Sequence, residues 1–208
     1  MNEEKVVWIG IDQSYHSTGL TIQFSDKPNI LFYQFCDSRE KHSMNVNFVL
    51  YQRVKSNTDN FSKDEQNRIK SAHNLFMEIY KYLQMHCKEY PVWNVAIEGQ
   101  VMSGFSKNQM MRLTDLVCLG TILRYNFMRL KQVRLNIFPP TTVKKYFTGS
   151  GKAKKEDMIR EFVERFPVSF QAEGKIDDVV DSYALCEIIH RPENKKVLPR
   201  KKKTRVTK

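Results

Sequence analysis

The sequence predicts an α/β protein in which a mixed sheet of about five strands is covered by helices. The first 37 residues hold three short apolar runs separated by polar turns, a pattern typical of a strand meander. From residue 62 onward, segments with helical periodicity alternate with short apolar runs. With 208 residues and 41% apolar content, the chain can build one core of ordinary size.

The expected strands are short apolar runs, each bounded by polar or turn-forming residues. They cover residues 5–12, 17–24, 29–37, 92–99 and 132–138. Helical periodicity and proline positions place the helices between and after these strands. They are expected at 62–90, 106–131, 139–147, 156–166 and 175–190. The connection 37–60 is polar and weakly periodic, so we expect it to be irregular and interpret it as lid-like.

Positive charge is concentrated at the carboxyl end of the chain. The net charge is +11, but eight of the 34 Lys and Arg residues lie in 194–208, which holds no acid, so residues 1–193 carry only +3. We therefore predict one folded domain over 1–190 and a basic, disordered tail over 191–208. The positive charge favours a polyanionic partner, and the tail suggests either nonspecific DNA affinity or nuclear localisation in a eukaryotic host.

The sequence predicts neither a membrane span nor a signal peptide. No apolar run approaches the roughly 20 residues that a span requires, and the amino terminus leads directly into a strand pattern. We therefore expect a soluble protein of the cytoplasm in a bacterial or phage setting. The four cysteines are widely spaced and lie among apolar residues, which favours reduced, buried thiols over disulfides or zinc ligands.

Four acids stand where carboxylates can serve chemistry. Asp12 and Glu98 each end an apolar strand, and two further acids lie three positions apart near the start of the last helix, Asp178 and Asp181. Strand ends of α/β folds commonly carry the site, and a spacing of three places both helix acids on one face. Carboxylates brought together repel one another unless cations neutralise them. The pattern therefore predicts a pair of Mg²⁺ ions.

Each acid has an ordinary structural interpretation as well. Asp177 and Asp178 could cap the last helix and complement its dipole. Asp12 could belong to a turn, and Glu98 could pair with a lysine. Asp181 is different, because it lies a turn inside the helix among apolar residues that should face the protein. A capping role does not explain it.

Taken together, these segments resemble the RuvC-type Holliday junction resolvases, which have the RNase H-like fold. The resemblance covers roughly residues 5–190 and rests on an ordered series of motifs. These are "IGIDQSYHSTGLTI", "VAIEGQVMSGFSKN", "PPTTVKKYFTGSGKAKKEDM" and "DDVVDSYALCEIIH". The third is the most specific, because V-K-K, G-x-G and A-x-K at that spacing are hard to obtain by accident.

The resemblance implies a homodimeric nuclease that cuts a four-way DNA junction by two symmetric nicks. It assigns four residues as catalytic and metal-binding, namely Asp12, Glu98, Asp178 and Asp181. Two Mg²⁺ ions, which Mn²⁺ should replace, would flank the scissile phosphate, with Asp12 shared between them. The products would be a 5′ phosphate and a 3′ hydroxyl. Which helicase, if any, delivers the junction is not encoded in these motifs.

The resemblance also implies residues that contact DNA. Lys144 and Lys155 match the family lysines near the junction phosphates, and Lys152 and Lys154 lie in the same loop, although a solvated surface is the ordinary role of such lysines. Phosphate contacts of this kind position DNA without reading its sequence. Met102 or Phe105 is expected to enter the junction. The helix 106–131 carries more than one apolar stripe, which predicts a contact with a second subunit.

The chain departs from the family pattern at two places. Gln13 and Ser14 follow the first acid, where the family usually has Pro and Gly. Gly99 follows Glu98 where the family usually has Gln, and Gln100 comes one place later. These departures put the local backbone after Asp12 and the register of the segment 99–105 in doubt.

Three other functions fit part of the pattern. Another RNase H-like nuclease, acting on flaps, hybrids or precursor RNA, would use the same four acids. The first motif also resembles the phosphate loop of actin-like ATPases, but that class needs a second phosphate loop and an adenosine site. A non-catalytic DNA-binding protein would not need acids at all four positions.

Overall fold

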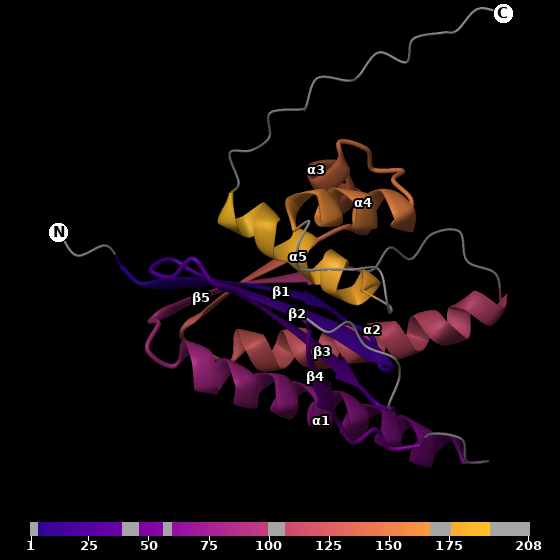
Figure 1. The fold of residues 1–208 in the computed structure, drawn as a ribbon. Helices are drawn as coiled ribbons and strands as arrows, with labels where there is room; N and C mark the ends of the chain where they lie inside the picture. Colours follow the sequence, from indigo (N-terminus) through magenta and orange to yellow (C-terminus); the bar gives the residue numbers. More distant parts are fainter. Residues whose placement is uncertain (1–3, 39–45, 56–59, 100–106, 167–175, 192–208) are drawn as a thin grey trace, which may run out of the picture.

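The computed structural model describes residues 4–38, 46–55, 60–99, 107–166 and 176–191, which form three layers. A central sheet has α1 and α2 on one face and α3, α4 and α5 on the other (Figure 1). The strands are β1 (Val6–Asp12), β2 (Ser17–Phe24), β3 (Ile30–Cys36), β4 (Asn47–Leu50), β5 (Val92–Glu98) and β6 (Val133–Phe138). The helices are α1 (Phe61–Cys87), α2 (Lys107–Met128), α3 (Pro140–Thr148), α4 (Lys155–Arg165) and α5 (Asp177–His190).

The sheet is mixed, with strand order β4-β3-β2-β1-β5-β6. The first three strands form an antiparallel meander, while β5 pairs parallel to β1 and β6 pairs parallel to β5. The connection between β5 and β6 crosses over through α2, and the chain reaches β5 from β4 through α1. The predicted α/β class, with a mixed sheet flanked by helices, is confirmed.

The number of strands is corrected from five to six. Asn47–Leu50, inside the connection expected to be irregular, pairs parallel to the end of β3 and forms an edge strand. Four residues are too few to show a clear period of two, and the pairing depends on a partner elsewhere in the chain. A short parallel strand of this kind cannot be predicted from its local sequence pattern.

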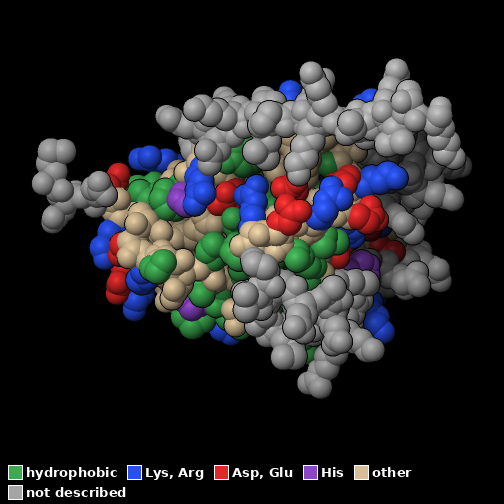
Figure 2. Space-filling model, turned by 45° about the horizontal axis from the view of Figure 1, so that its top comes forward, with side chains coloured by type: hydrophobic (Ala, Val, Ile, Leu, Met, Phe, Trp, Pro, Cys, Tyr) green, Lys and Arg blue, Asp and Glu red, His purple; other side chains and the backbone are tan. Residues whose placement is uncertain are grey.

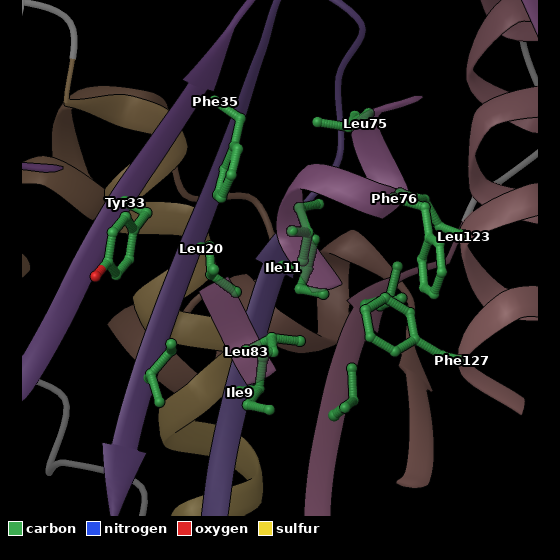
Figure 3. Close-up of a cluster of buried hydrophobic side chains, with 14 of the residues drawn as sticks. Ile9, Ile11, Leu20, Tyr33, Phe35, Leu75, Phe76, Leu83, Leu123 and Phe127 are labelled. Carbon is green, nitrogen blue, oxygen red and sulfur yellow. The ribbon is translucent and has the colours of Figure 1, made fainter. Parts of the chain in front are cut away.

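The larger core lies between the sheet and helices α1 and α2. Ile9 and Ile11 of β1 and Leu20 of β2 point from the sheet toward α1, which contributes Leu75 and Leu83 (Figure 3). All five side chains are fully buried. The helical period predicted for residues 62–90 therefore marks the face that packs on the sheet.

The second core lies on the opposite face, under α3, α4 and α5. Helix α5 is apolar on nearly all sides, with Val179, Val180, Ala184 and Leu185 buried. An all-round apolar helix belongs in the interior of a protein, because no side of it can face water favourably. Phe162 of α4 fills the space beside it.

All four cysteines are free thiols, three of them buried and Cys118 partly exposed, as predicted. In the described part of the chain, no helix has the length and apolar character needed to cross a membrane.

Candidate active site

The ends of β1 and β5 bring the first two acids to one edge of the sheet. The two strands are parallel, and Ile11 pairs with Ile97, so the following residues, Asp12 and Glu98, end neighbouring strands at the same edge. The Gln13 side chain ties these ends together, because its Nε2 donates to the Glu98 carbonyl oxygen at 3.1 Å. The predicted position of both acids at the carboxyl edge is confirmed by this register.

Two glycines let α5 lie directly on the sheet. A Cβ atom added at Gly19 of β2 would overlap the backbone carbonyl of Asp178, and one added at Gly10 of β1 would overlap that of Ser182. Because Gly19 is the register partner of Asp12, this contact sets the start of α5 beside the end of β1. Glycine inside a strand often marks such a close backbone approach.

Asp178 is held by the sheet and does not cap the helix. Its carboxylate accepts hydrogen bonds from the Ser17 hydroxyl and from Gln34 Nε2, the latter at 3.2 Å. The N-cap position of α5 belongs to Ile176, and no side chain caps this end. The capping interpretation of Asp178 is therefore wrong, since its side chain points at β2 and β3.

Burial and mutual repulsion raise the pKa values of all four predicted acids. Burial raises the pKa of Asp12 well above its ordinary value, and the charges of Asp181, Glu98 and Asp178 raise it further. Burial likewise raises the pKa of Glu98 to about 7 and that of Asp181 to about 6, and Asp181 adds to the shift of Glu98. Burial also raises the pKa of Asp178, against the hydrogen bond from Ser17. The four side chains thus form one electrostatic cluster.

The acid cluster suits a divalent cation of the Mg²⁺ type. Among the described residues, no ion pair neutralises Asp12, Glu98, Asp178 or Asp181, although all four are at most partly exposed. Partly buried, unpaired carboxylates are costly, and oxygen donors are the ligands that Mg²⁺ and Mn²⁺ prefer. Within the same part of the chain, no three His, Cys, Asp or Glu side chains lie close enough to form a complete metal site. The acids are therefore neighbours, and their oxygen donors fit the ion, but they are not arranged as a coordination shell.

Two of the predicted lysines lie beside the acids. The Lys144 charge, on α3, lowers the pKa values of both Glu98 and Asp181. Lys155, the first residue of α4, forms an ion pair with Asp177. Acidic and basic side chains are interleaved across the face that carries α3, α4 and α5 (Figure 2). Positive charge thus borders the acid cluster on this side.

The other predicted contact residues are more distant or not described. Lys152 and Lys154 are exposed in the turn before α4. The backbone N–H of Lys154 donates to Asp157 at 3.0 Å, which completes the start of that helix. Met102 and Phe105, expected to enter the junction, lie outside the described residues.

Sequence reasoning missed the residues that fix α5 in place. Gly10, Gly19, Ser17 and Gln34 position Asp178, yet none was singled out as functional. The two glycines carried a usable signal, because a glycine within an apolar strand run indicates close approach of another backbone. Ser17 and Gln34 carried none, since polar residues on strands are common.

The raised pKa of Glu98 predicts that the metal-free protein loses stability as the pH rises. A carboxyl that binds its proton more tightly when folded stabilises the fold at low pH, and that stabilisation is lost as the pH rises through the folded pKa. For Glu98 this window runs from 4.5 to about 7. Thermal unfolding should therefore show wild type losing about 1–3 kcal/mol relative to Glu98→Gln between pH 5 and pH 8.

Added Mg²⁺ provides the matching control. At pH 8 it should raise the melting temperature of wild type more than that of Glu98→Gln, because the cation offsets the carboxylate charges. At pH 5 this difference should shrink, since protonated carboxyls bind the ion poorly. If the stabilities of the two proteins changed in parallel with pH, the pKa of Glu98 would not be raised in the folded state.

A scan of protein-family models and a search of curated proteins give no significant match. Among solved structures, the chain is similar to RuvC of Thermus thermophilus, at 16% identity and a TM-score of 0.47 over 88% of this chain and 90% of that chain. It is similar at 14% identity to T. thermophilus RuvC in complex with a Holliday junction substrate, with a TM-score of 0.48 over 88% and 91%. A third similar structure is the yeast mitochondrial Holliday junction resolvase, at 14% identity and a TM-score of 0.49 over 88% and 76%.

Proposed function

We propose that this protein is a Mg²⁺-dependent endonuclease that resolves four-way DNA junctions by paired nicks. The observation that carries the proposal is the cluster of four carboxylates at the shared edge of β1, β5 and α5, for which the described part of the chain provides no ion-pair partner. Such a cluster is unfavourable for folding, because the charges repel one another in a partly buried place. Unfavourable charge clusters of this kind are typical of functional sites.

In this mechanism the four acids hold the metal ions, and the surrounding residues orient the acids. Asp12 stands between β2 and β5, so it is the acid best placed to serve both ions. Ser17 and Gln34 fix the orientation of the Asp178 carboxylate. Bound Mg²⁺ would supply Lewis-acid stabilisation of charge on the scissile phosphate and would lower the pKa of the attacking water.

The basic residues of α3 and α4 would hold the DNA. Lys144, whose charge reaches Glu98 and Asp181, is suited to a phosphate next to the cut. Lys155 would exchange its ion pair with Asp177 for a DNA phosphate, while Lys152 and Lys154 would add contacts farther out. Met102 and Phe105 remain candidates for the residue that enters the junction.

A homodimer would give the two symmetric cuts a structural basis, because a two-fold junction calls for a two-fold enzyme. Tyr125 and Met128 of α2 and Ile137 of the edge strand β6 are all exposed apolar side chains, which supports a contact with a second copy on this side. Sedimentation at micromolar concentration should show a dimer, and a monomer would contradict this part of the proposal.

Cleavage of a synthetic four-way junction, with and without Mg²⁺, is the direct test. We expect two symmetric nicks with 5′ phosphate ends in the presence of Mg²⁺ or Mn²⁺, and none with chelator. A panel of flap, RNA–DNA hybrid and linear duplex substrates separates the alternatives. Preference for a hybrid or flap over the junction would assign the same acids to a different RNase H-like nuclease, and absence of cleavage on every substrate would contradict the proposal.

A further inference from the structure

A second group of charged side chains lies along the same sheet edge, beyond Asp178. We name it the Arg53 cluster and define it as His16, Asp37 and Arg53. Arg53 Nη1 donates to Asp37 Oδ2 at 2.9 Å and lies 3.0 Å from the His16 ring, while His16 Nδ1 lies 3.1 Å from the same Asp37 oxygen. One carboxylate thus gathers two basic side chains at a single point.

The Arg53 cluster is a direct continuation of the acid cluster. Ser17, whose hydroxyl donates to Asp178, is the register partner of Cys36 at the end of β3. His16 and Asp37 are the next residues outward on these two strands, and the Asp37 N–H donates to the His16 carbonyl oxygen at 3.3 Å. The cluster therefore stands one residue beyond the Ser17–Cys36 pair, in which Ser17 contacts Asp178.

Strand β4 is what brings Arg53 to this position. Leu50 pairs with Cys36, and the following Tyr51 N–H donates to the Cys36 carbonyl at 3.0 Å. The chain then passes over the turn between β1 and β2, where the Val54 N–H donates to Ser71 of α1 at 2.9 Å. The connection that the sequence analysis interprets as lid-like thus delivers a guanidinium to the edge of the site.

The Arg53 side chain is held in place by more than its ion pair. Its guanidinium lies over the Tyr15 ring, with 5.4 Å between Cζ and the ring centroid. Tyr15 is itself buried, donates to the Arg68 carbonyl oxygen and accepts from the Tyr51 hydroxyl at its own carbonyl. Among the described residues, only Nη1 of the guanidinium has a hydrogen-bond partner. A fixed arginine with unused donors is well suited to bind a phosphate.

A purely structural role accounts for only part of this arrangement. The Arg53–Asp37 pair could hold the segment 51–55 after β4 in place. The His16 side chain, however, is 73% exposed at the tip of a turn. An exposed imidazole adds little to stability through such a contact. The exposed imidazole instead lies directly beside a fixed guanidinium, at the edge of the proposed active site.

We propose that Arg53, with the exposed His16 ring beside it, binds a phosphate of the strand being cut, within about four nucleotides of the scissile phosphate. Asp12 and Asp37 end strands that are two places apart in the sheet. In the sheet register Asp12 is level with Gly19 and Gln34, so Asp37 lies about 10 Å across the strands and about 10 Å farther along them, about 14 Å away in all. This distance is comparable with the rise of about four nucleotides along one DNA strand. With Lys144 on the other side of the acids, the DNA strand would be held on both sides of the cut. This inference rests on the proposed nuclease function and extends it to the path of the substrate.

Arg53→Gln tests this path through the salt dependence of junction binding. Binding is measured with Ca²⁺ in place of Mg²⁺, so that the DNA stays intact. We expect affinity about 3- to 10-fold weaker and a salt slope smaller by about one unit, because one phosphate contact is lost. The matched control is Lys88→Gln, which removes one positive charge from an exposed residue that follows α1, before the start of β5 and at the opposite end of the strands. An unchanged slope in Arg53→Gln, or an equal change in the control, would overturn the inference.

Junctions that carry one uncharged methylphosphonate at a time locate the contact. In wild type, one position within about four nucleotides of the cut should weaken binding, and this sensitivity should disappear in Arg53→Gln because the contact is already lost. Persistence of the full sensitivity in the variant would assign that phosphate to another residue. The double variant Asp37→Asn/Arg53→Gln leaves no unpaired carboxylate in the Arg53 cluster. Its melting temperature shows whether the fold is intact.

A failure of this phosphate contact can be distinguished from a failure of the proposed function. If wild type neither prefers nor cuts a junction, the nuclease proposal fails before Arg53 is considered. If wild type cuts the junction while Arg53→Gln binds and cuts it identically, only the phosphate contact is wrong.

Discussion

Asp12→Asn is expected to reduce cleavage of a four-way junction by at least about a thousandfold while junction binding is retained. The substitution keeps the shape of the side chain but removes the charge that the metal ions need, and metal ions contribute several kcal/mol to such reactions. It also removes one of four mutually repelling carboxylates, so the variant should melt at the same temperature as wild type or higher. Single-turnover cleavage, binding and thermal unfolding measure the three effects.

The combination of lost cleavage and unreduced stability separates a catalytic acid from a structural one. Asp26→Asn serves as the control, because Asp26 follows β2 at the opposite edge of the sheet, where it pairs with Lys5 at 2.9 Å. It should lose some stability and keep full cleavage. Undiminished cleavage by Asp12→Asn, or a large loss of its stability, would remove Asp12 from the proposed mechanism. Asp181→Asn should behave as Asp12→Asn does.

Gly19→Ala is expected to disable the site without changing any charged residue. Its Cβ would overlap the Asp178 backbone, so α5 must move away from β2. Overpacking of this kind costs about 1–3 kcal/mol. A displacement of about 1 Å at a reacting centre can lower the rate about a hundredfold. Cleavage measured well below the melting temperature of the variant should therefore fall much further than stability alone explains.

Gly149→Ala offers a comparison for the stability effect. Gly149 ends α3 with φ of 81°, and an added Cβ would meet nothing within 4 Å. Its replacement should cost about 1 kcal/mol through backbone strain alone. If Gly19→Ala unfolded no more easily than Gly149→Ala and cleaved like wild type, the close packing of α5 on the sheet would not be what positions the acids.

The sequence was a good guide wherever the signal is local. Long apolar periodicity marked α1 and α5, and Pro91 correctly marked the boundary between α1 and β5. It failed for β4, whose four residues gain their structure from pairing with β3. For α2, the predicted range 106–131 and the observed Lys107–Met128 differ only at the ends, where helices fray and assignments vary.

Apart from β4, the sequence by itself determined the order of the elements, and it singled out the four acids as candidates, because periodicity and strand ends depend on neighbouring residues. Only the tertiary structure decided how these acids meet. Ser17 and Asp178 are 161 residues apart, and their contact depends on α5 lying against two glycines. Within the described segments, the lack of ion-pair partners for the acids and the approach of Arg53 to His16 are also products of the folded chain. Contacts between distant segments depend on how the layers pack, and local spacing carries no record of that packing.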